Sequence, residues 1–330
     1  MSILFYFLNY YVILSIINGG FMESFEVNLH KAMRKCEGYV DKNCHSFFEI
    51  YTFTTENVSD SIKYFDLKDK SLFTVGSSFD QVLNGYYYGA RDITLFDINA
   101  NAKYYAYLKI AAILCLSYTE FIEFFFLHGI KDYYNKNRFS KELFYKIKDT
   151  LRLLDYESFL FFDELFCLYD TKTIIDYLFD DDEHRPDVIK GFNIYLSTEE
   201  NYNYLKSILK KISFKFVCGD IFKDNIDGKF DNMILSNLCT TTNIEELKKL
   251  LEKLDKNNLN DNGSILFAYL WGIDFMSNEY KDDWHDIYKM PITRQKLKKY
   301  ITETHKIKSG RDILWDINEN GDLILVYRKK

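Results

Sequence analysis

The sequence predicts an α/β protein with a mainly parallel sheet, an antiparallel hairpin strand near the C-terminus and a helical insertion. Short apolar strands alternate with helical segments at 70–117, and the alternation resumes at 214–269. Between these parts, residues 118–212 carry Leu, Ile and Phe at helical spacing. The chain has 330 residues, of which 47% are hydrophobic, so it can build a sizeable core and is not a disordered chain.

The first α/β unit begins with a strand at Lys70–Val75, which runs into Gly76 and then a helix at Asp80–Tyr88. A second strand, Asp92–Asp97, ends on an acid, and a helix follows from Asn99 to about Ser117. This succession of strand, glycine turn, helix, strand and acid is typical of a Rossmann-like βαβ unit with a right-handed crossover.

The remaining elements complete the sheet around the insertion. Helices are expected at Tyr118–Leu127, Lys141–Leu154, Tyr156–Leu168, Thr171–Phe179, from Ser197–Glu200 onward, Ile244–Leu254 and Thr293–Thr302, and strands at Phe214–Cys218, Phe230–Leu235, Ser264–Tyr269, Asp312–Asp316 and Leu323–Tyr327. The turn Asn318–Gly321 predicts a hairpin between the last two strands. We expect an apolar segment at 1–21, helices at 22–66, and a Rossmann-like domain at 67–330 with its helical insertion at 118–197.

Charge and composition exclude several classes of site. The net charge is −7, and Lys alternates with Asp and Glu along the chain, which argues against duplex nucleic acid as a partner. Aromatic residues make up 18%, which we interpret as codon bias rather than a stacking platform. The six cysteines form no CxxC pair, so we expect buried free thiols and no zinc site. The acidic loop Asp180–His184 is predicted to be solvated rather than metal-binding.

The first 17 residues are nearly all apolar, and three interpretations are open. Met22 lies just before a polar helical segment, so the upstream stretch can be a mis-assigned start. It can also be a membrane-associating helix. A secretory signal is the third interpretation, although no Lys or Arg precedes the apolar run. We expect a cytoplasmic protein that is associated with membranes if this segment anchors it.

The turn after the first strand is a candidate cofactor loop. Gly76 lets the backbone approach a ligand closely, and Ser77, Ser78 and the amides at the start of the next helix can bind a carboxylate. Asp80 can hold an ammonium group. S-adenosylmethionine has both groups on its methionine end, so the loop predicts this cofactor. Phe79 stands where a smaller residue is more usual.

Two further strand ends extend this site. Asp97 lies about 20 residues after Gly76, where a carboxylate can accept both ribose hydroxyls of an adenosine. Asp220 follows the third strand and can accept from the adenine amine. The full set of predicted cofactor-binding residues is Gly76, Ser77, Ser78, Asp80, Asp97, Ile98, Asn99, Asp220 and Ile221.

The acceptor side is expected at the ends of the fourth and fifth strands. Ser236 and Asn237 follow the fourth strand, where their side chains can orient an amine or hydroxyl nucleophile, and we predict them as catalytic residues. The polar break at Thr52–Asn57 offers Thr54 or Thr55 as the cap of the helix that follows. The predicted substrate-binding residues are Thr55, Asn57, Tyr269 and Trp271. No metal is expected.

Several of these segments resemble the BtaA-like family over about Thr52–Trp271. The similar segments are Ser71–Gln81, Thr94–Asn99, Tyr107–Ile113, Tyr118–Phe121, Phe230–Asn237 and Leu266–Trp271. BtaA-type enzymes are S-adenosylmethionine:diacylglycerol 3-amino-3-carboxypropyl transferases with the class I methyltransferase fold. The resemblance therefore implies that fold, that cofactor and a lipid or small-molecule acceptor. This chain departs from the family in its shorter length and in a loop with fewer glycines.

The resemblance favours aminocarboxypropyl transfer, with methyl transfer as the alternative. The two reactions differ in which carbon of the sulfonium faces the acceptor. A non-catalytic Rossmann-like binding module and a nicotinamide oxidoreductase also remain open, the first because of Phe79. The acceptor and the oligomeric state are not predicted.

Overall fold

The computed structural model describes residues 50–76, 78–126, 138–180, 186–210, 213–238, 242, 244–271, 302–307 and 322–329. Its strands are β1 (Ile50–Tyr51), β2 (Ser71–Val75), β3 (Arg91–Asp97), β4 (Phe179–Asp180), β5 (Phe214–Cys218), β6 (Phe230–Ile234), β7 (Leu259–Trp271), β8 (Glu303–Ile307) and β9 (Asp322–Arg328). Its helices are α3 (Val58–Ser61), the 3₁₀ turn η1 (Ile62–Tyr64), α4 (Asp80–Tyr87), α5 (Asn101–Cys115), α6 (Tyr118–Phe125), α7 (Lys141–Leu154), α8 (Tyr156–Leu168), α9 (Thr171–Leu178), α10 (Pro186–Phe192), α11 (Ile194–Ser197), α12 (Glu199–Leu209) and α14 (Ile244–Asn257).

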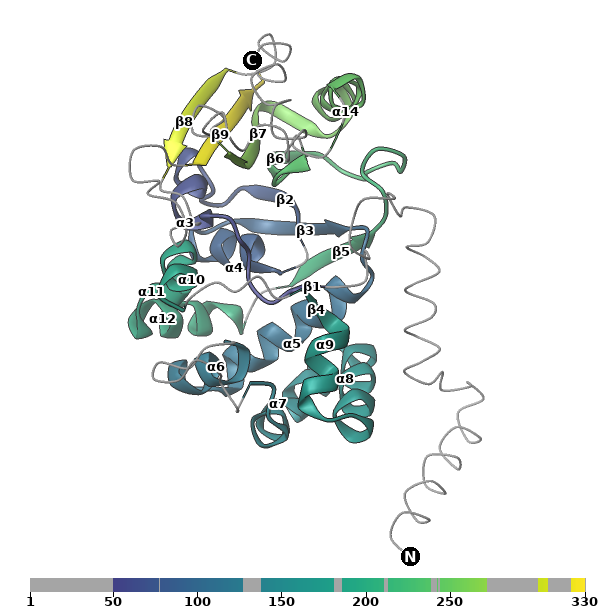
Figure 1. Cartoon of the computed structure of the whole chain (residues 1–330). Helices are drawn as coiled ribbons and strands as arrows, with labels where there is room; N and C mark the ends of the chain where they lie inside the picture. The colour runs from purple at the N-terminus through teal and green to yellow at the C-terminus, as the bar shows by residue number, and fades with distance from the viewer. Residues whose placement is uncertain are drawn as a thin grey trace, which may run out of the picture.

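Seven of the described strands form one sheet in the order β5-β3-β2-β6-β7-β9-β8 (Figure 1). The five strands β5, β3, β2, β6 and β7 run parallel to their neighbours, whereas β9 is antiparallel to both β7 and β8. The central strand β2 is the first of the parallel set in sequence, so the chain winds outward from it in both directions. This arrangement confirms the predicted Rossmann-like class I methyltransferase fold, including the antiparallel strand near the C-terminus.

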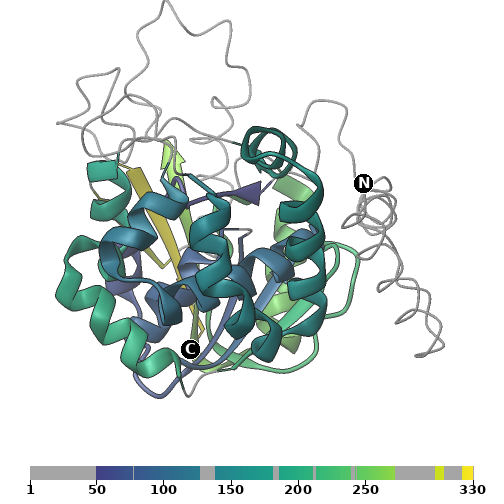
Figure 2. The same cartoon turned by 90° about the horizontal axis from the view of Figure 1, so that it is seen from below.

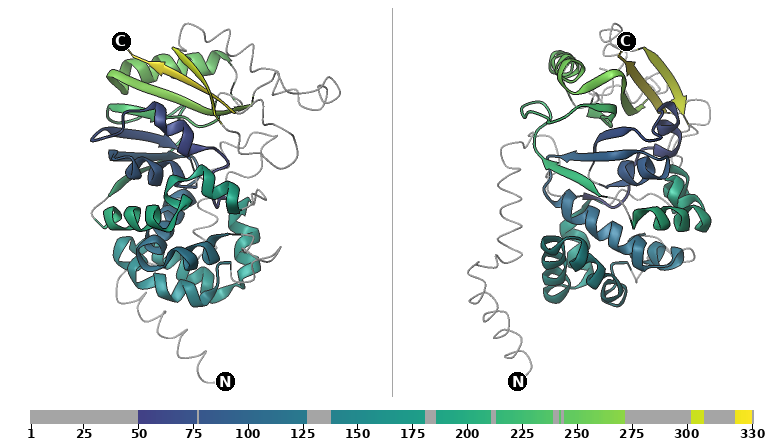
Figure 3. Two further views of the ribbon diagram at one scale, coloured as in Figure 1. Left: turned by 90° about the vertical axis from the view of Figure 1, so that its left-hand side faces the viewer. Right: turned by 180° about the vertical axis from the view of Figure 1, so that it is seen from behind.

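The two faces of the sheet are covered by different elements because successive strand residues point to opposite sides. Leu72 and Leu95 belong to the core that includes α4, α5 and the insertion helices. Phe73 and Phe96, one position further along, belong to a second core with the apolar face of α14. Figure 3 shows the insertion helices gathered on one side of the molecule and α14 apart from them. Seen from below, the insertion helices lie in front of the sheet (Figure 2).

Short polar side chains cap the N-termini of several insertion helices at the positions that the sequence predicts. Ser140, Asp155 and Asp170 cap α7, α8 and α9 by accepting from the backbone N–H three residues later. Ser117 and Glu120 form a reciprocal capping box at the start of α6. These local signals explain why the predicted bounds of α7 and α8 match the structure.

A second, two-stranded sheet links distant parts of the chain. β1 pairs in parallel with β4, which places Ile50 beside Phe179 and Tyr51 beside Asp180. The segment that follows β1, Thr52–Asn57, therefore starts beside the insertion and runs toward the central sheet.

Several predicted elements differ from the structure. The cap of the first described helix is Asn57, whose side chain accepts from Asp60 N–H at 3.1 Å, and not Thr54 or Thr55. Asn57 directly precedes the helix, so its side chain reaches the free N–H groups of the first turn, whereas Thr54 and Thr55 lie further upstream. The helix α10 begins at Pro186, shortly after the predicted acidic loop, and neither α10 nor α11 was predicted.

The C-terminal hairpin is also different in detail. β9 pairs with β7 and with β8, a strand that the sequence did not predict. The predicted helices at 22–49, the strand at 312–316, the turn at 318–321 and the loop at 181–185 lie outside the described residues, as does most of the predicted helix at 293–302. The described cysteines, Cys115, Cys167 and Cys218, are thiols and not disulfides, as predicted, but Cys167 is exposed and the other two are half-buried rather than buried.

Candidate functional site

The loop between β2 and α4 takes two backbone conformations that few residues adopt. Gly76 has φ +147°, where only glycine is free of strain, and a Cβ there would lie 2.9 Å from Gln81 Oε1. Phe79 has φ +68°, and its ring is fully buried against Phe214, with 4.8 Å between the ring centroids. The unusual Phe79 is therefore a core residue held in a left-handed conformation. Such strain is often found at binding loops.

Asp97 lies beside this loop because β2 and β3 are adjacent, with Val75 opposite Phe96. Its Oδ1 accepts from Asn99 N–H at 2.8 Å. Burial raises the pKa of Asp97 to about 6, although the backbone N–H groups of Asn99, Ile98 and Gly76 oppose that rise. The structure thus places Gly76 and Asp97 together, and the pKa of this carboxyl lies well above its ordinary value.

The predicted neighbours of Asp97 have mainly structural contacts. Asn99 is buried, and its Oδ1 accepts from Asn101 N–H at 2.9 Å at the start of α5. The carbonyl of Ile98 lies 3.5 Å from Cys218 Sγ on the adjacent strand β5. Both residues shape the loop that carries Asp97.

The loop after β5 reaches the same edge of the sheet. Gly219 N–H donates to the carbonyl of Asp97 at 3.0 Å, which fixes the two strand ends together. The Asp220 carboxylate accepts from Phe222 N–H at 2.9 Å and lies 3.1 Å from Lys223 Nζ. Ile221 is buried in the core on the α14 side. Asp220 therefore lies where the sequence places it, with its carboxylate engaged by its own loop.

Asp80 has a different environment from the one predicted. Its Oδ1 accepts from Lys109 Nζ at 2.6 Å and from Tyr195 O–H at 2.7 Å, and its Oδ2 accepts from Thr54 N–H at 2.6 Å. Asp80 and Lys109 are both fully buried. This carboxylate is directed into the protein and enclosed by protein donors, so the predicted contact with a ligand ammonium is replaced by an internal ion pair.

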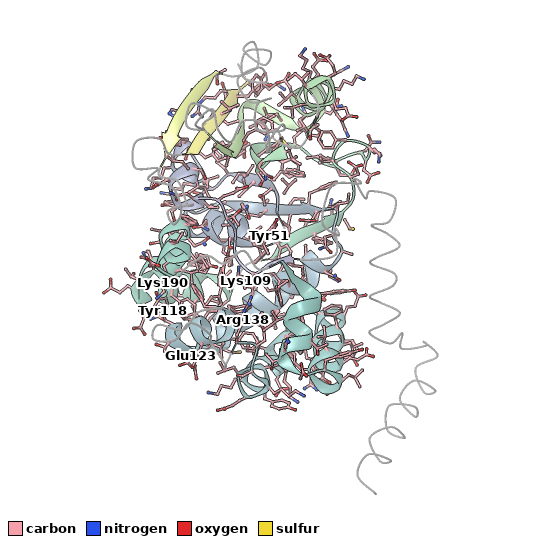
Figure 4. The ribbon with its side chains drawn as sticks, in the orientation of Figure 1. Tyr51, Lys109, Tyr118, Glu123, Arg138 and Lys190 are labelled. Atoms are coloured by element: carbon pink, nitrogen blue, oxygen red, sulfur yellow. The ribbon has the colours of Figure 1, made fainter. Side chains whose placement is uncertain are left out.

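Lys109 connects this ion pair to two segments of the site. Its Nζ also donates to the carbonyl of Ser78 at 2.8 Å and to that of Thr52 at 3.0 Å, and it lies 4.3 Å from the Phe53 ring centroid. Burial lowers the pKa of Lys109 to about 8, against the attraction of Asp80, which raises it. Figure 4 shows Lys109 in the interior of the molecule, on the side of the insertion helices. Lys109 thereby holds the cofactor loop and the Thr52–Asn57 segment in place.

Ser236 lies near the loop because β6 is the other neighbour of β2, with Thr74 opposite Ile234. Ser236 has φ +51° and donates its hydroxyl hydrogen bond to Glu56 Oε1. Glu56 is only 4% exposed. Gln81 Nε2 lies 3.5 Å from Glu56 Oε2 and 3.5 Å from Thr54 Oγ1. Asn237 follows Ser236 in the same half-buried turn.

Glu56 and Gln81 are site residues that the sequence did not predict. Glu56 lies between the two predicted substrate residues, Thr55 and Asn57, but its contact with Ser236 appears only in three dimensions. Thr55 is half-buried, whereas Asn57 is buried and occupied as the cap of α3. A long polar side chain at the first turn after a glycine loop is the signal that points to Gln81.

Three predicted residues have no side-chain description. Ser77 lies outside the described residues, and for Tyr269 and Trp271 only the backbone, in β7, is described. In the described part of the chain, no group of three or more His, Cys, Asp or Glu side chains is arranged to hold a metal ion. The helices among the same residues include none that is both long and apolar enough for a membrane span.

No protein-family model and no curated protein sequence matches the chain. Similar solved structures include the ribosomal protein L11 methylase from Lactobacillus delbrueckii subsp. bulgaricus, with 13% identity over 83% of this chain and 78% of that chain and a TM-score of 0.35. Another is the N-methyltransferase NodS from Bradyrhizobium japonicum WM9 in complex with S-adenosyl-L-homocysteine, with 9% identity over 90% of this chain and 98% of that chain and a TM-score of 0.39.

A third similar structure is TehB from Haemophilus influenzae, with 12% identity over 91% of this chain and 67% of that chain and a TM-score of 0.34. At these identities and TM-scores the likeness identifies neither a reaction nor a substrate. The resemblance to the BtaA-like family is not confirmed by these findings and stays a prediction.

Proposed function

We propose that this protein binds S-adenosylmethionine at the carboxyl edge of the sheet and transfers its methyl group to an acceptor that approaches Ser236. The observation that supports this most directly is the contact between the Gly76 loop and Asp97. A glycine with φ +147° allows a close backbone approach, and the half-buried carboxylate at the neighbouring strand end is suited to accept from ribose hydroxyls.

The proposed pose follows from the order of the strand ends. The ribose hydroxyls donate to Asp97 and the adenine lies toward Asp220, since β3 and β5 are adjacent. The methionine end then lies over Gly76 and points toward β6, where Ser236 and Asn237 end the next strand. The sulfonium is thereby placed between the cofactor loop and the acceptor residues.

The protein orients the cofactor and the acceptor and excludes water from them, and it forms no covalent bond with either. The acceptor atom attacks the methyl carbon along the line of the breaking carbon–sulfur bond, and the thioether leaves. A single in-line alignment of this kind supplies much of the rate enhancement of group transfer. An acceptor that carries an extra proton after the transfer then releases it to the solvent.

Methyl transfer is proposed first because the methyl carbon is the least hindered of the three carbons on sulfur. An acceptor that reaches the sulfonium from the sheet edge meets it without rearrangement of the methionine chain. Transfer of the 3-amino-3-carboxypropyl group to a lipid or small-molecule acceptor is the second candidate, which the resemblance to BtaA-type enzymes favours. It requires the γ-carbon of that chain to face the acceptor.

The spent cofactor distinguishes the two reactions. The full chain is incubated with S-adenosylmethionine and a cell extract that supplies acceptors, and the products are identified by mass spectrometry. S-adenosylhomocysteine that depends on active protein supports methyl transfer, and methylthioadenosine supports aminocarboxypropyl transfer. The matched control is the Asp97→Asn variant, which keeps the shape of the side chain. Absence of both products, together with no binding of S-adenosylhomocysteine in calorimetry, would contradict the proposed function.

A further inference from the structure

Three polar side chains from distant segments, two of them buried, meet between the candidate cofactor loop and the end of β6. Glu56 comes from the segment after β1, Gln81 from the first turn of α4, and Ser236 from the turn after β6. Glu56 is 4% exposed and Gln81 is 3% exposed. A carboxylate in such a position requires several hydrogen-bond donors or a cation, because burial of an uncompensated charge is costly.

One acceptor in this cluster has no donor among the described residues. Gln81 Oε1 is fully buried and receives no hydrogen bond from them. The Nε2 atom of the same side chain makes only long contacts, 3.5 Å to Glu56 Oε2 and 3.5 Å to Thr54 Oγ1. A buried acceptor left unsatisfied costs about 1–3 kcal/mol, so its retention requires an explanation. A bound donor group would supply one.

The unsatisfied oxygen is directed at the glycine of the cofactor loop. Gln81 Oε1 lies 2.9 Å from the position that a Cβ on Gly76 would occupy. Under the proposed function, the methionine end of the cofactor crosses this glycine. That end carries a primary ammonium group with three N–H donors, which suits a carboxylate and an amide oxygen as acceptors.

We propose that Glu56 and Gln81 Oε1 form the binding site for the α-ammonium group of the cofactor's methionine end. Asp80, the other acid near this loop, is unsuited because Lys109 already pairs with it in the interior. The Ser236 hydroxyl, which donates to Glu56, orients the carboxylate and connects the ammonium site to the acceptor side. This inference rests on the proposed function and deepens it.

The test compares two ligands that differ only at the methionine end. S-adenosylhomocysteine carries the amino-acid chain, and 5′-methylthioadenosine has the same nucleoside and thioether without it. Binding of both to the full chain is measured by calorimetry for the unmodified protein, Glu56→Gln and Gln81→Met. We expect each variant to lose about tenfold or more in affinity for S-adenosylhomocysteine, since a charged or otherwise unsatisfied hydrogen bond is removed. Affinity for methylthioadenosine is expected to stay within about twofold.

Asp231→Asn is the matched control, because Asp231 is a hydrogen-bonded carboxylate at the opposite end of β6, where it contacts Ser71. It is expected to change neither affinity. Gln81→Met keeps the fold testable if Glu56→Gln does not fold, and circular dichroism checks each variant.

Equal weakening of both ligands, or no change in either, would overturn the ammonium site. A variant that lowers turnover without altering either affinity would also overturn it, and would assign Glu56 to the acceptor instead. If the unmodified protein binds neither ligand, it is the proposed function that fails.

Discussion

Two buried carboxylates lie on either side of the cofactor loop, and they have opposite surroundings. Asp80 has three protein donors at 2.6–2.7 Å, among them a fully buried lysine. Glu56 is contacted by a hydroxyl and, at 3.5 Å, by an amide whose own oxygen lacks a donor among the described residues. An acid next to a glycine loop is therefore not in itself a ligand site. Asp80 is already paired with the Lys109 ammonium, whereas the Gln81 amide oxygen beside Glu56 has no donor among the described residues, and this difference favours the Glu56 side as the proposed ammonium site.

The largest expected effect on stability comes from removing Lys109, the partner of the Asp80 carboxylate. Lys109→Met leaves Asp80 buried without its cation, which should lower the free energy of unfolding by about 3–5 kcal/mol. Urea denaturation followed by circular dichroism measures this. Lys63→Met, at the exposed pair with Asp60, is the control and should change stability by at most about 1 kcal/mol. If Lys109→Met lowers the free energy of unfolding by no more than the control does, the ion pair between Lys109 and Asp80 does not stabilise the loop.

Substitutions at Phe79 test the left-handed backbone conformation of the loop between Glu56 and Asp80. Phe79→Ala removes a buried ring and should destabilise the fold by about 3–5 kcal/mol. Phe79→Gly removes the same ring but relieves the positive φ, so it should be more stable than the Ala variant by about 1 kcal/mol. Thermal or urea unfolding of the pair gives the difference. The reverse order, as found at ordinary helix positions, would show that the left-handed conformation is not maintained.

Asp97→Asn provides the reference for a contact that both ligands share. S-adenosylhomocysteine and methylthioadenosine have the same ribose, so both should lose affinity in parallel, by about tenfold or more. This contrasts with Glu56→Gln, which is expected to affect only the first ligand. Calorimetry on the two variants side by side measures the contrast. If Asp97→Asn separates the ligands, the proposed orientation of the cofactor is wrong.

The smallest effect is a pH dependence of binding. Burial raises the pKa of Asp97 to about 6, and ribose hydroxyls that donate to the carboxylate favour its ionised form. Affinity should therefore be constant above about pH 7 and fall as the pH drops through 6, approaching about tenfold per pH unit well below the pKa. Titrations between pH 5 and 8 test this. Asp97→Asn should abolish the dependence.

Much of the fold follows from local sequence signals. The bounds of α7, α8 and β5 were predicted because caps, apolar spacing and polar breaks coincide there. β8 was not predicted, since only the last of its five residues, Ile307, is apolar, and the strand depends on pairing with β9. The short helices α10 and α11 likewise depend on packing rather than on a periodic pattern, since they pack against each other, α10 also against α3 and α11 also against α4.

The candidate site was predictable only where strand order determines it. Gly76, Asp97, Asp220 and Ser236 follow parallel strands, so their meeting at one sheet edge follows from the topology. The directions in which the Asp80 and Glu56 side chains point do not follow from the topology. Asp80 points inward because it pairs with Lys109, and Lys109 lies in the middle of a helix whose sequence resembles ordinary core. Pairing of a buried charge is a three-dimensional property, and single-sequence patterns do not encode it.

The pairing of β1 with β4 has a consequence for how the chain reaches its native state. These strands lie on either side of most of the insertion in sequence, so their contact closes a long loop, and such contacts form slowly. The segment that carries Thr54 and Glu56 follows β1 directly. We therefore expect the central sheet to form before this segment docks, so that the candidate site is completed late in folding and is among the first parts to open locally under mild denaturation.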